Sequence, residues 1–387
     1  MNFKYVVVGA GLAGLTIAER IASILGEEVL VIEKREHIGG NCYDEVVDGI
    51  IVHKYGPHLF HTDNERVWEY LSQFTEWRIY QHKVLGVIDG MEVPIPFNLN
   101  SLYKLFPPKM AEKLEEKLVT SFGYGKRIPI GDLLKEQDKE LQFLAQFVYD
   151  KIFKNYSRKQ WGMDPSKLGE EVFKRVPVVI GRDDRYFTDR FQGVPKKGYT
   201  YLFRRMIKNK KIKLLLNTDA GELISLDEKK GKIKFMGKEF KGILVFTGEL
   251  DRLFEYKYGP LPYRTLQFEV EKIDKLSFQK VGVVNYPNNY KFTRITEFKH
   301  IHPISLPYSI IMKEFPASYN PNTDIPYYPI PSEESREKYH RYLQLAHNIK
   351  NLILIGRLAE YRYYNMDAIV ERALEVFEKR ILSSSLY

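Results

Sequence analysis

The sequence has a single cysteine, Cys42, among its 387 residues. One thiol cannot form an internal disulfide or a multi-cysteine metal site, and scarce cysteine is typical of proteins from reducing compartments. We therefore expect a cytoplasmic protein. The motif around Cys42 contains no evident partner for thiol catalysis, so packing is its expected role.

Long apolar runs are also lacking. The most apolar early stretch, from Tyr5 to Ala18, is interrupted by three glycines and followed by Glu19 and Arg20. It is too short to span a bilayer, and it lacks a basic leader and a small-residue cleavage site. We expect neither a signal peptide nor membrane insertion. A charged fraction of 28% and a hydrophobic fraction of 44% fit an ordinary soluble protein of two or three domains.

The familiar catalytic motifs are missing as well. The sequence has no Gly-x-Ser-x-Gly elbow and no His-Glu-x-x-His motif, and its nine histidines do not group with carboxylates at metal-ligand spacing. We expect no metal site. The net charge of +9 is compatible with nucleic acid, a membrane surface or an anionic small ligand. Because no nucleic-acid-binding motif is visible, we favour the anionic ligand and expect no nucleic-acid binding.

The sequence does contain a glycine-punctuated turn near its start. An apolar run from Tyr5 leads into Gly9, Gly11 and Gly14, the pattern of a dinucleotide-binding fold. Gly9 allows the tight turn, Gly11 lets the backbone approach a pyrophosphate, and Gly14 lets the helix pack on the strand. A second apolar run ends in Glu33, about 20 residues on, where an acid accepts the ribose hydroxyl hydrogen. Together they predict an adenine-dinucleotide site.

A second glycine pair, Gly39 and Gly40, bears on which dinucleotide binds. A nicotinamide site usually continues into an ordinary helix, whereas backbone crowding beyond the acid suits the larger FAD. Arg35 and Asn41 flank the pair with groups able to contact phosphate or flavin. A plain loop is the alternative interpretation. FAD is the expected cofactor.

The middle of the chain changes from strand-like to helical patterns. A hairpin turn is predicted at Asp89-Gly90, between two runs of strand-forming residues. From about 101 to 162 the period is helical, with an apolar face over residues 141–148. Asp132 is the expected cap at the start of that helix.

Later segments return to the cofactor-binding fold. Residues 243–248 and 352–356 are apolar without alternation, as in strands buried on both faces, and a last helix is predicted at 368–377. Between them, residues 263–329 contain short strands typical of an antiparallel sheet. The expected architecture is α/β: a discontinuous Rossmann-like FAD-binding domain (residues 1–86, 206–248 and 349–387), an inserted helical domain (98–168) and an antiparallel β-sheet substrate domain (87–97, 169–205 and 249–348).

Arginines close in sequence to aromatic residues are the most distinctive feature outside the glycine motif. Arginine forks bind phosphate oxygens in pairs, and aromatic faces stack on bases and sugars, so the pairing suits a nucleotide diphosphate. Tyrosine and phenylalanine also fill cores, so packing is the alternative for any single ring. The runs are residues 156–161, 175–177, 186–187, 292–294, 327–328 and 357–364.

With these motifs in this order, the chain resembles the UDP-galactopyranose mutase family along nearly its whole length. The matching segments are the N-terminal glycine motif and residues 38–43, 55–62, 156–161, 175–177, 292–297, 327–329 and 356–367. The resemblance implies a flavoenzyme, active with reduced FAD, that interconverts UDP-galactopyranose and UDP-galactofuranose for cell-surface glycans. N5 of the flavin is then the nucleophile at the anomeric carbon. An external reductant such as NAD(P)H and a homodimer are expected.

The family's functional residues match positions in this chain. Its two diphosphate-binding arginines match Arg175 and Arg294, and its uridine-stacking tyrosine matches Tyr156. The other expected catalytic and substrate-binding residues are His58, Trp161, Tyr186, Phe187, Asn285, Tyr328, Tyr363 and Asn365. The cofactor-binding residues expected from the glycine motif and the family together are Gly9, Gly11, Leu12, Ala13, Gly14, Glu33, Lys34, Arg35, Gly40, Asn41, His58, Leu59, Gly356, Arg357, Tyr363, Asn365, Met366 and Asp367.

One position departs from the family, because Asn365 stands where an aspartate is common. An amide donates as well as accepts, so how the sugar hydroxyls or the diphosphate are held there stays open. The helix beginning near Asp367 is expected to direct its N-terminal dipole at the flavin. Arg175 is expected on a segment, residues 167–179, that closes over the substrate.

Three alternative functions stay open. The substrate could be an N-acetylated UDP-galactose, although His58 favours the unsubstituted sugar. An amine-oxidase-like flavin oxidoreductase would share the glycine motif but would not need paired phosphate-binding arginines. The third alternative is a non-catalytic flavin or nucleotide-binding protein.

Overall fold

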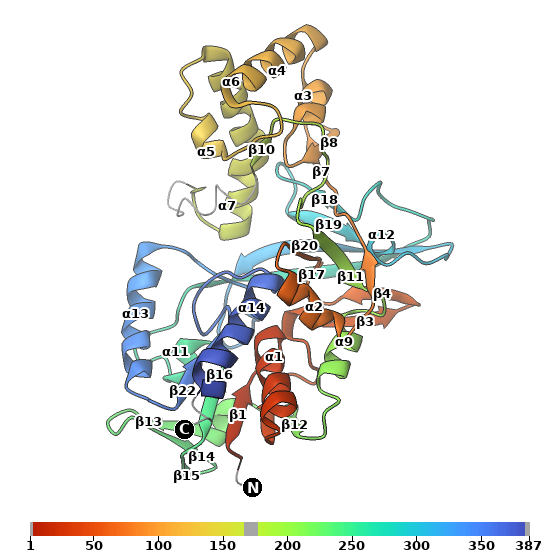
Figure 1. Cartoon of the computed structure of the whole chain (residues 1–387). Coiled ribbons are helices and arrows are strands. Elements are labelled where there is room, and N and C mark those ends of the chain that lie inside the picture. Colours follow the sequence, from red (N-terminus) through yellow and green to blue (C-terminus); the bar gives the residue numbers. More distant parts are fainter. Residues whose placement is uncertain (1–2, 166–176, 384–387) are drawn as a thin grey trace.

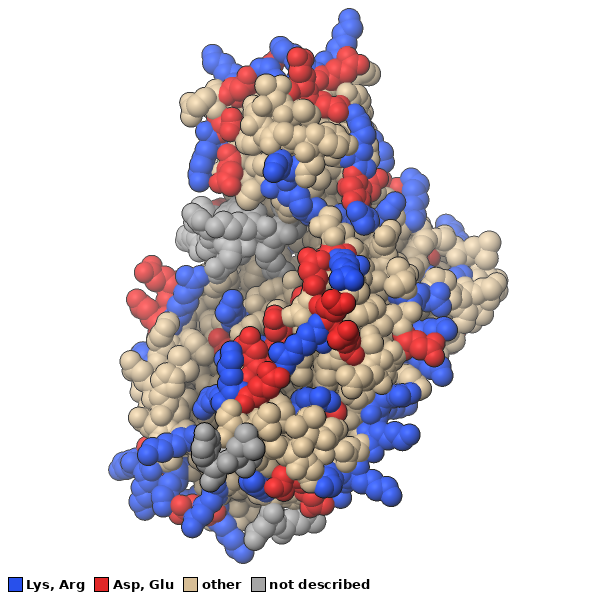
Figure 2. Space-filling model, in the orientation of Figure 1, with Lys and Arg blue, Asp and Glu red and all other residues tan. Residues whose placement is uncertain are grey.

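The computed structural model describes residues 3–165 and 177–383. A nucleotide-binding body lies at one end of the molecule, a large sheet lies beside it, and a lobe of helices forms the other end (Figure 1). The first strand and the last helix both belong to the nucleotide-binding body. Basic and acidic side chains are interspersed over the face shown in Figure 2. Among the described residues, no helix is both long and apolar enough to cross a membrane.

The nucleotide-binding body is built on a five-stranded sheet in the order β12-β2-β1-β16-β22. Its strands are β1 (Tyr5–Val8), β2 (Val29–Ile32), β12 (Ile212–Leu215), β16 (Ile243–Phe246) and β22 (Leu352–Leu354). All neighbouring strands are parallel, with Val7 opposite Val31 and Val245. Segments from the start, middle and end of the chain thus lie side by side, which confirms the discontinuous Rossmann-like fold.

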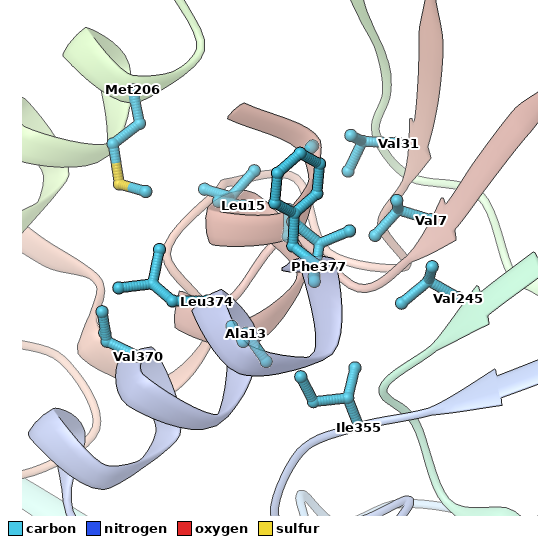
Figure 3. Close-up of a cluster of buried hydrophobic side chains, with 14 of the residues drawn as sticks. Val7, Ala13, Leu15, Val31, Met206, Val245, Ile355, Val370, Leu374 and Phe377 are labelled. Atoms are coloured by element: carbon cyan, nitrogen blue, oxygen red, sulfur yellow. The ribbon is translucent and has the colours of Figure 1, made fainter. Parts of the chain in front are cut away.

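Both faces of this sheet are covered, as its unalternated apolar strands predict. Val7 packs in one core with Leu15 of α1 (Leu12–Arg20) and Leu374 of α14 (Met366–Val376), as Figure 3 shows. Its neighbour Val6 lies in the opposite core with Tyr342 of α13 (Glu333–His347). Each fully buried side chain of this size contributes about 1.5–3 kcal/mol of transfer free energy, so the two cores hold the strands together.

Smaller elements complete the nucleotide-binding body. Helices α2 and α9 add side chains to the core of α1 and α14, and α11 and a three-stranded antiparallel sheet add theirs to the opposite core. A turn at Met236-Gly237 joins β14 to β15, with positive φ at both residues. These elements are α2 (Glu65–Ser72), α9 (Tyr199–Met206), α11 (Leu250–Leu253), β13 (Ile224–Asp227), β14 (Lys232–Phe235) and β15 (Lys238–Phe240).

A seven-stranded sheet, in the order β21-β17-β20-β19-β18-β7-β8, forms the middle of the molecule. Neighbours are antiparallel, as predicted, except for the parallel pair β18 and β7. The predicted hairpin turn at Asp89-Gly90 joins β7 to β8. Because all of β7 pairs in this sheet, the boundary predicted after residue 86 divides one strand. The strands are β7 (Val84–Ile88), β8 (Met91–Ile95), β17 (Tyr263–Ile273), β18 (Val283–Asn285), β19 (Arg294–Glu297), β20 (Ser309–Ser318) and β21 (Tyr328–Pro329).

Short strands connect the large sheet to the nucleotide-binding body. Val52 of the β3–β4 hairpin and Val194 of β11 share a core with Phe298 of α12 and Met312 of β20. β11 pairs with both β5 and β6. The elements are β3 (Asp44–Val47), β4 (Ile50–His53), β5 (Phe60–Thr62), β6 (Trp77–Ile79), β11 (Phe191–Pro195) and α12 (Phe298–Ile301).

The lobe of helices shares a core with β7, β8 and β18 of the large sheet, and one predicted cap in the lobe was wrong. Asp132 lies inside α5, and Asp138 caps α6, accepting hydrogen bonds from the backbone N–H of Glu140 and Leu141 at 2.8 and 3.1 Å. A cap must directly precede the first helical residues, whose N–H groups lack partners, and Asp132 is too far upstream. The helices are α3 (Leu99–Leu105), α4 (Pro108–Phe122), α5 (Ile130–Leu133), α6 (Lys139–Val148) and α7 (Asn155–Trp161), with a π-helical turn at Tyr149–Lys154 and a short ladder of β9 (Arg127–Ile128) with β10 (Val178–Val179).

Replacing Gly14 by alanine should destabilise the nucleotide-binding body. A Cβ at Gly14 would lie 1.9 Å from the carbonyl oxygen of Gly9, so α1 would have to move away from β1. We expect Gly14→Ala to lower the free energy of unfolding by about 2 kcal/mol or more, as overpacking does. Gly131→Ala is the control, because a Cβ there meets nothing within 4 Å. Equal midpoints of urea unfolding for the two variants would contradict this account of the α1–β1 contact.

Candidate active site

A cavity of about 630 Å³ opens at the carboxyl ends of β1, β2 and β16. This edge is where parallel α/β sheets bind their ligands, and the size lies within the range of small-molecule and cofactor sites. The predicted cofactor residues that line it are Gly9, Gly11, Leu12, Ala13, Glu33, Lys34, Arg35, Gly40, Asn41, His58, Gly356, Arg357 and Met366.

The glycine turn is held to the strand end by the buried carboxylate of Glu33. Its Oε2 accepts a hydrogen bond from the backbone N–H of Ala10 at 2.8 Å, and its Oε1 accepts one from the N–H of Arg35 at 3.0 Å. The carbonyl oxygen of Ala10 in turn accepts from the N–H of Gly39 at 2.7 Å. A carboxylate has about four lone-pair sites, so Glu33 retains capacity for a ribose hydroxyl.

The glycines differ in what surrounds them. A Cβ at Gly11 would meet only Gly40, at 3.8 Å, so the space beside Gly11 is open. A Cβ at Gly40 would lie 3.1 Å from the Cα of Gly11, and one at Gly39 would lie 2.9 Å from the ring of Phe203. Both residues of the pair have positive φ. Protein neighbours thus explain the pair, and the crowding predicted against a larger cofactor is not needed to account for it.

Arg35 provides the best test of whether an anionic dinucleotide fits. Its Nη2 donates to Oδ1 of Asn41 at 2.8 Å, and its guanidinium lies 4.6 Å from the ring centroid of Tyr55. Its Nη1 is buried and has no hydrogen-bond partner among the described residues. A buried cationic donor without an acceptor is costly, and a phosphate oxygen would satisfy it. Lys34 instead pairs with Glu249 at 3.4 Å.

Two ionisable side chains at the inner end of the cavity are held uncharged. Burial lowers the pKa of His58 to about 4, and its Nδ1 bonds to the carbonyl oxygen of Gly56 at 2.8 Å. Burial raises the pKa of the Cys42 thiol to about 12, and its Sγ lies 3.8 Å from Sδ of Met366. At neutral pH the imidazole is therefore neutral and the thiol protonated, which agrees with packing as the role of Cys42.

Five predicted cofactor residues do not line the cavity. Gly14 packs α1 against Gly9, and Leu59 packs in the core between the β3–β4 hairpin and the large sheet. Asn365 is the exposed N-cap residue of α14 and makes no side-chain capping bond. The remaining two are Tyr363 and Asp367. Because Met366, the first residue of α14, lines the cavity, the positive end of this helix lies at the cavity wall.

On the substrate side, Arg294 of β19 lies partly buried between two elements. Its Nη2 donates to the hydroxyl of Tyr156 on α7 at 2.7 Å, and its Nε lies 3.4 Å from Oε1 of Glu314 on β20. Burial lowers the pKa of Arg294, but Glu314 and neighbouring phenols raise it by more, so the net pKa lies above its ordinary value. Arg294 is therefore a permanent cation.

Several polar atoms near Arg294 lack partners in the described structure. Asn285, Arg294 and Glu314 stand opposite one another on β18, β19 and β20. Oδ1 of Asn285, Nε of Arg294 and Oε1 of Glu314 are buried without a hydrogen bond. Most buried polar groups are hydrogen-bonded, so a row of unsatisfied groups indicates a site for a polar ligand.

Aromatic rings lie between this arginine and the cofactor cavity, and the first of them, Tyr328, interacts electrostatically with Arg294. The ring of Tyr328 lies 6.0 Å from that of Trp161 and 6.1 Å from that of Tyr363. The guanidinium of Arg357, which lines the cavity, lies 4.7 Å from the ring of Tyr363 and 5.6 Å from that of Tyr328. The predicted substrate wall and the cofactor cavity are thus contiguous.

A second aromatic group contains Tyr186 and Phe187, whose rings are 5.0 Å apart. His61 stacks on Phe187 at 3.6 Å, and the ring of His82 lies 5.7 Å from that of Tyr186. Burial lowers the pKa of His82 to about 3. Sequence reasoning missed His82, as it missed Glu314, because neither lies in a motif and both reach the site through long-range packing.

Arg175 lies outside the described residues, as does most of the segment predicted to close over the substrate. The cavity is also lined by residues 218–221 and 247–249, which were not among the predicted site residues. They follow β12 and β16, so the rule that ligands bind at carboxyl strand ends could have found them.

The fold and the cavity define a dinucleotide-binding protein of the Rossmann class. A family model for NAD(P)-binding Rossmann-like domains matches residues 7–74, and one for UDP-galactopyranose mutase matches residues 151–363. The chain belongs to the UDP-galactopyranose mutase family, and it is accordingly a mutase, an isomerase by reaction class.

Named relatives support this assignment over the full chain. The chain is 35% identical over 386 residues to a probable UDP-galactopyranose mutase of Klebsiella pneumoniae, covering 99% of this chain and 96% of that protein. It is also 35% identical over 379 residues to a dTDP-fucopyranose mutase of Escherichia coli, covering 96% and 97%. A crystal structure of reduced UDP-galactopyranose mutase superposes with a TM-score of 0.73 at 16% identity, covering 100% of this chain and 95% of that chain, so the fold is shared.

Filling the open space at Gly11 should remove the cofactor without unfolding the chain. The backbone φ of Gly11 is −86°, and a Cβ on this residue would lie 3.8 Å from its nearest neighbour, the Cα of Gly40. Valine therefore fits the backbone, while its methyl groups project beside the phosphate-binding turn. We expect Gly11→Val to purify without the visible absorbance bands of flavin and with an unchanged circular dichroism spectrum. Gly131→Ala should retain normal flavin content. Full cofactor retention by Gly11→Val would contradict the assignment of the turn.

Proposed function

We propose that the chain is an FAD-dependent isomerase that interconverts UDP-galactopyranose and UDP-galactofuranose. One observation carries the proposal: Arg294, a partly buried permanent cation bonded to Tyr156, interacts electrostatically with Tyr328, whose ring lies 5.6 Å from the guanidinium of Arg357 at the cavity wall. Such a site suits two ligands side by side, a nucleotide diphosphate and a dinucleotide. Family membership supplies the reaction class.

The residues present in the cavity fit FAD. Gly11 leaves room for a pyrophosphate, Glu33 has free lone pairs for a ribose, and Arg35 has an unsatisfied donor for a phosphate. When bound and reduced, FAD would supply a nucleophilic nitrogen, N5, for attack at the anomeric carbon. The N-terminal end of α14 would favour an anionic reduced flavin electrostatically.

The arginines would stabilise the departing UDP. Negative charge on the diphosphate grows as the bond to the anomeric carbon breaks, and a pre-positioned cation lowers the barrier to that step. Arg294 is held for this role by Tyr156 and Glu314. Arg175 is the second arginine that we propose for the diphosphate, on the basis of the family resemblance.

The aromatic residues would orient the nucleotide and exclude water. Tyr156 and Trp161 lie on one helix, α7; the ring of Tyr156 would stack on uracil, and that of Trp161 would form part of the substrate wall. Tyr328 and Tyr363 would close the sugar site between the uridine and the cofactor. Holding a substrate in one orientation against a bound reactant can supply a large part of a rate enhancement.

The identity of the sugar is the finer part of the proposal. The Escherichia coli relative, a dTDP-fucopyranose mutase, is as similar as the Klebsiella protein, so dTDP-fucopyranose is a second candidate substrate. A UDP-N-acetylgalactopyranose is a third, and Asn365 is the position where sugar contacts are expected to differ. We further propose a cytoplasmic homodimer that uses an external reductant such as NAD(P)H and supplies galactofuranose for cell-surface glycans.

Loss of Arg294 should reduce turnover with the fold intact. We expect Arg294→Ala to lower kcat by at least about tenfold, since removing one charge-stabilising donor commonly costs a factor of 10² or more. Arg294→Lys keeps the charge without the fork, so its loss should be smaller. Arg190→Ala is the control, because Arg190 is exposed and pairs with Glu65 at 3.5 Å. Full activity of flavin-loaded Arg294→Ala would place the diphosphate elsewhere.

Activity should depend on the redox state of the cofactor. The dithionite-reduced protein is expected to convert UDP-galactofuranose to UDP-galactopyranose, and the oxidised protein to be nearly inactive. Protein loaded with reduced 5-deaza-FAD, which has carbon in place of N5, should also be inactive. Chromatography of products from UDP-galactofuranose, its N-acetylated analogue and dTDP-fucofuranose identifies the sugar. Robust turnover with reduced 5-deaza-FAD would overturn the N5 mechanism and leave the family assignment standing.

A further inference from the structure

The predicted nucleotide site is assembled from two elements that are far apart in the sequence. Helix α7 carries Tyr156 and Trp161, and Lys159 lies between them. The β18–β19 loop, defined here as residues 286–293, joins the strand that ends at Asn285 to the strand that begins at Arg294. A ligand that contacts both elements therefore depends on how they are held relative to each other.

Lys159 connects the two elements through its ammonium group. Its Nζ donates to three backbone carbonyl oxygens of the β18–β19 loop, those of Tyr286, Tyr290 and Phe292, the last two at 3.1 Å. An ammonium has three donors, so all of them are used. Burial lowers the pKa of Lys159 to about 8, which leaves it cationic at neutral pH. These charge-assisted bonds are stronger than neutral ones.

The loop is built to transmit this restraint to its two ends. The N–H of Tyr286 donates to the carbonyl oxygen of Thr293 at 2.8 Å, closing the loop next to Asn285 and Arg294. The rings of Tyr286, Tyr290 and Phe292 pack on one another at 4.8–5.3 Å. A loop closed at its base and packed internally moves as one unit.

A weaker contact supports the same attachment. Nδ2 of Asn155, at the start of α7, donates to Oδ1 of Asn288 at 2.8 Å, and Nδ2 of Asn288 donates to the carbonyl oxygen of Lys151 at 2.8 Å. Separately, Arg264 of β17 donates to the carbonyl oxygens of Lys159 and Gln160 at 3.1 and 3.0 Å. Arg264 thus holds the end of α7 on the sheet independently of the loop, so α7 should stay folded without the Lys159 ammonium.

We propose that Lys159 is a positioning residue, whose ammonium fixes the spacing between α7 and the β18–β19 strand pair and thereby the affinity for the uridine diphosphate. This inference rests on the proposed function, because it assumes that both elements contact the nucleotide. Lys159 touches neither the cavity nor Arg294 in the described contacts, so its effect passes through the loop.

The test compares Lys159→Met with Lys159→Arg and a matched control. Methionine keeps the apolar stem without the donors, whereas arginine can again donate to several carbonyls. We expect Lys159→Met to raise the Kd of UDP for the oxidised, flavin-loaded protein and the KM for UDP-galactofuranose about tenfold each, with kcat changed less than about threefold. Lys159→Arg should recover most of the affinity. Lys154→Met is the control, since Lys154 is partly exposed and pairs with Asp150 at 3.2 Å on the turn before α7.

Asn288→Ala keeps the proposal testable if Lys159→Met does not fold. It removes the two asparagine bonds of the loop, and UDP affinity should fall about threefold, in line with one or two neutral hydrogen bonds. A folded Lys159→Met with only a lower Tm and unchanged Kd and KM would overturn the inference, as would unchanged UDP affinity in Asn288→Ala if Lys159→Met is unfolded. Wild-type protein that bound no UDP would overturn the proposed function and this inference with it.

Discussion

The arrangement of the cofactor cavity depends on the backbone of one residue, Ala10. Its N–H donates to the carboxylate of Glu33 at the end of β2, and its carbonyl oxygen accepts from the N–H of Gly39. The first strand-to-helix turn, the second strand end and the second glycine pair are thereby joined at one point. Gly40 then lies so close to Gly11 that a Cβ added to Gly40 would be 3.1 Å from the Cα of Gly11. A side chain at Gly40 would push these segments apart, whereas one at Gly11 would fill the open space that they leave.

A second constraint governs the substrate side, where the fold must partly bury a cation that keeps its charge. Isolated buried charges are costly, and Arg294 is compensated by Glu314 on the adjacent strand and by the hydroxyl of Tyr156. The compensation is incomplete, because Nε of Arg294 and Oε1 of Glu314 lack hydrogen bonds. An arginine held in this way is rigid, charged and still has a donor to offer, which are the properties needed to bind a diphosphate.

The features that could be predicted from sequence are those decided by local chemistry. Gly14 is required by a contact five residues away, and the Asp89-Gly90 turn by the positive φ of its own residues. The unalternated run of β16 was recognisable because burial on both faces leaves no polar position. For the cap of α6 the sequence predicts Asp132, whereas the structure has Asp138 in that position. Two aspartates in the same stretch give the same signal, and only backbone geometry separates them.

Long-range relations could not be predicted in the same way. Nothing in the sequence indicates that Glu314 stands opposite Arg294, that β7 pairs in parallel with β18, or that Lys159 reaches the carbonyls of a loop more than 120 residues away. These contacts depend on strand register and on the packing of the helical lobe against the sheet. The candidate site residues named from the family resemblance remain predictions, although the structure brings Tyr156, Trp161, Tyr328 and Arg294 into one contiguous region.

The protonation states of His58, His82 and Tyr156 argue against these three side chains as the acid or base of the reaction. Burial lowers the pKa of His58 to about 4 and that of His82 to about 3, and it raises the pKa of Tyr156 to about 12. An efficient general acid or base has a pKa near the working pH, and each of these groups is moved away from neutrality. What the site offers at neutral pH is a constant positive charge from Arg294 beside a nucleotide cavity. That combination suits the binding and release of a diphosphate, and in the function proposed above the nucleophile is supplied by the cofactor.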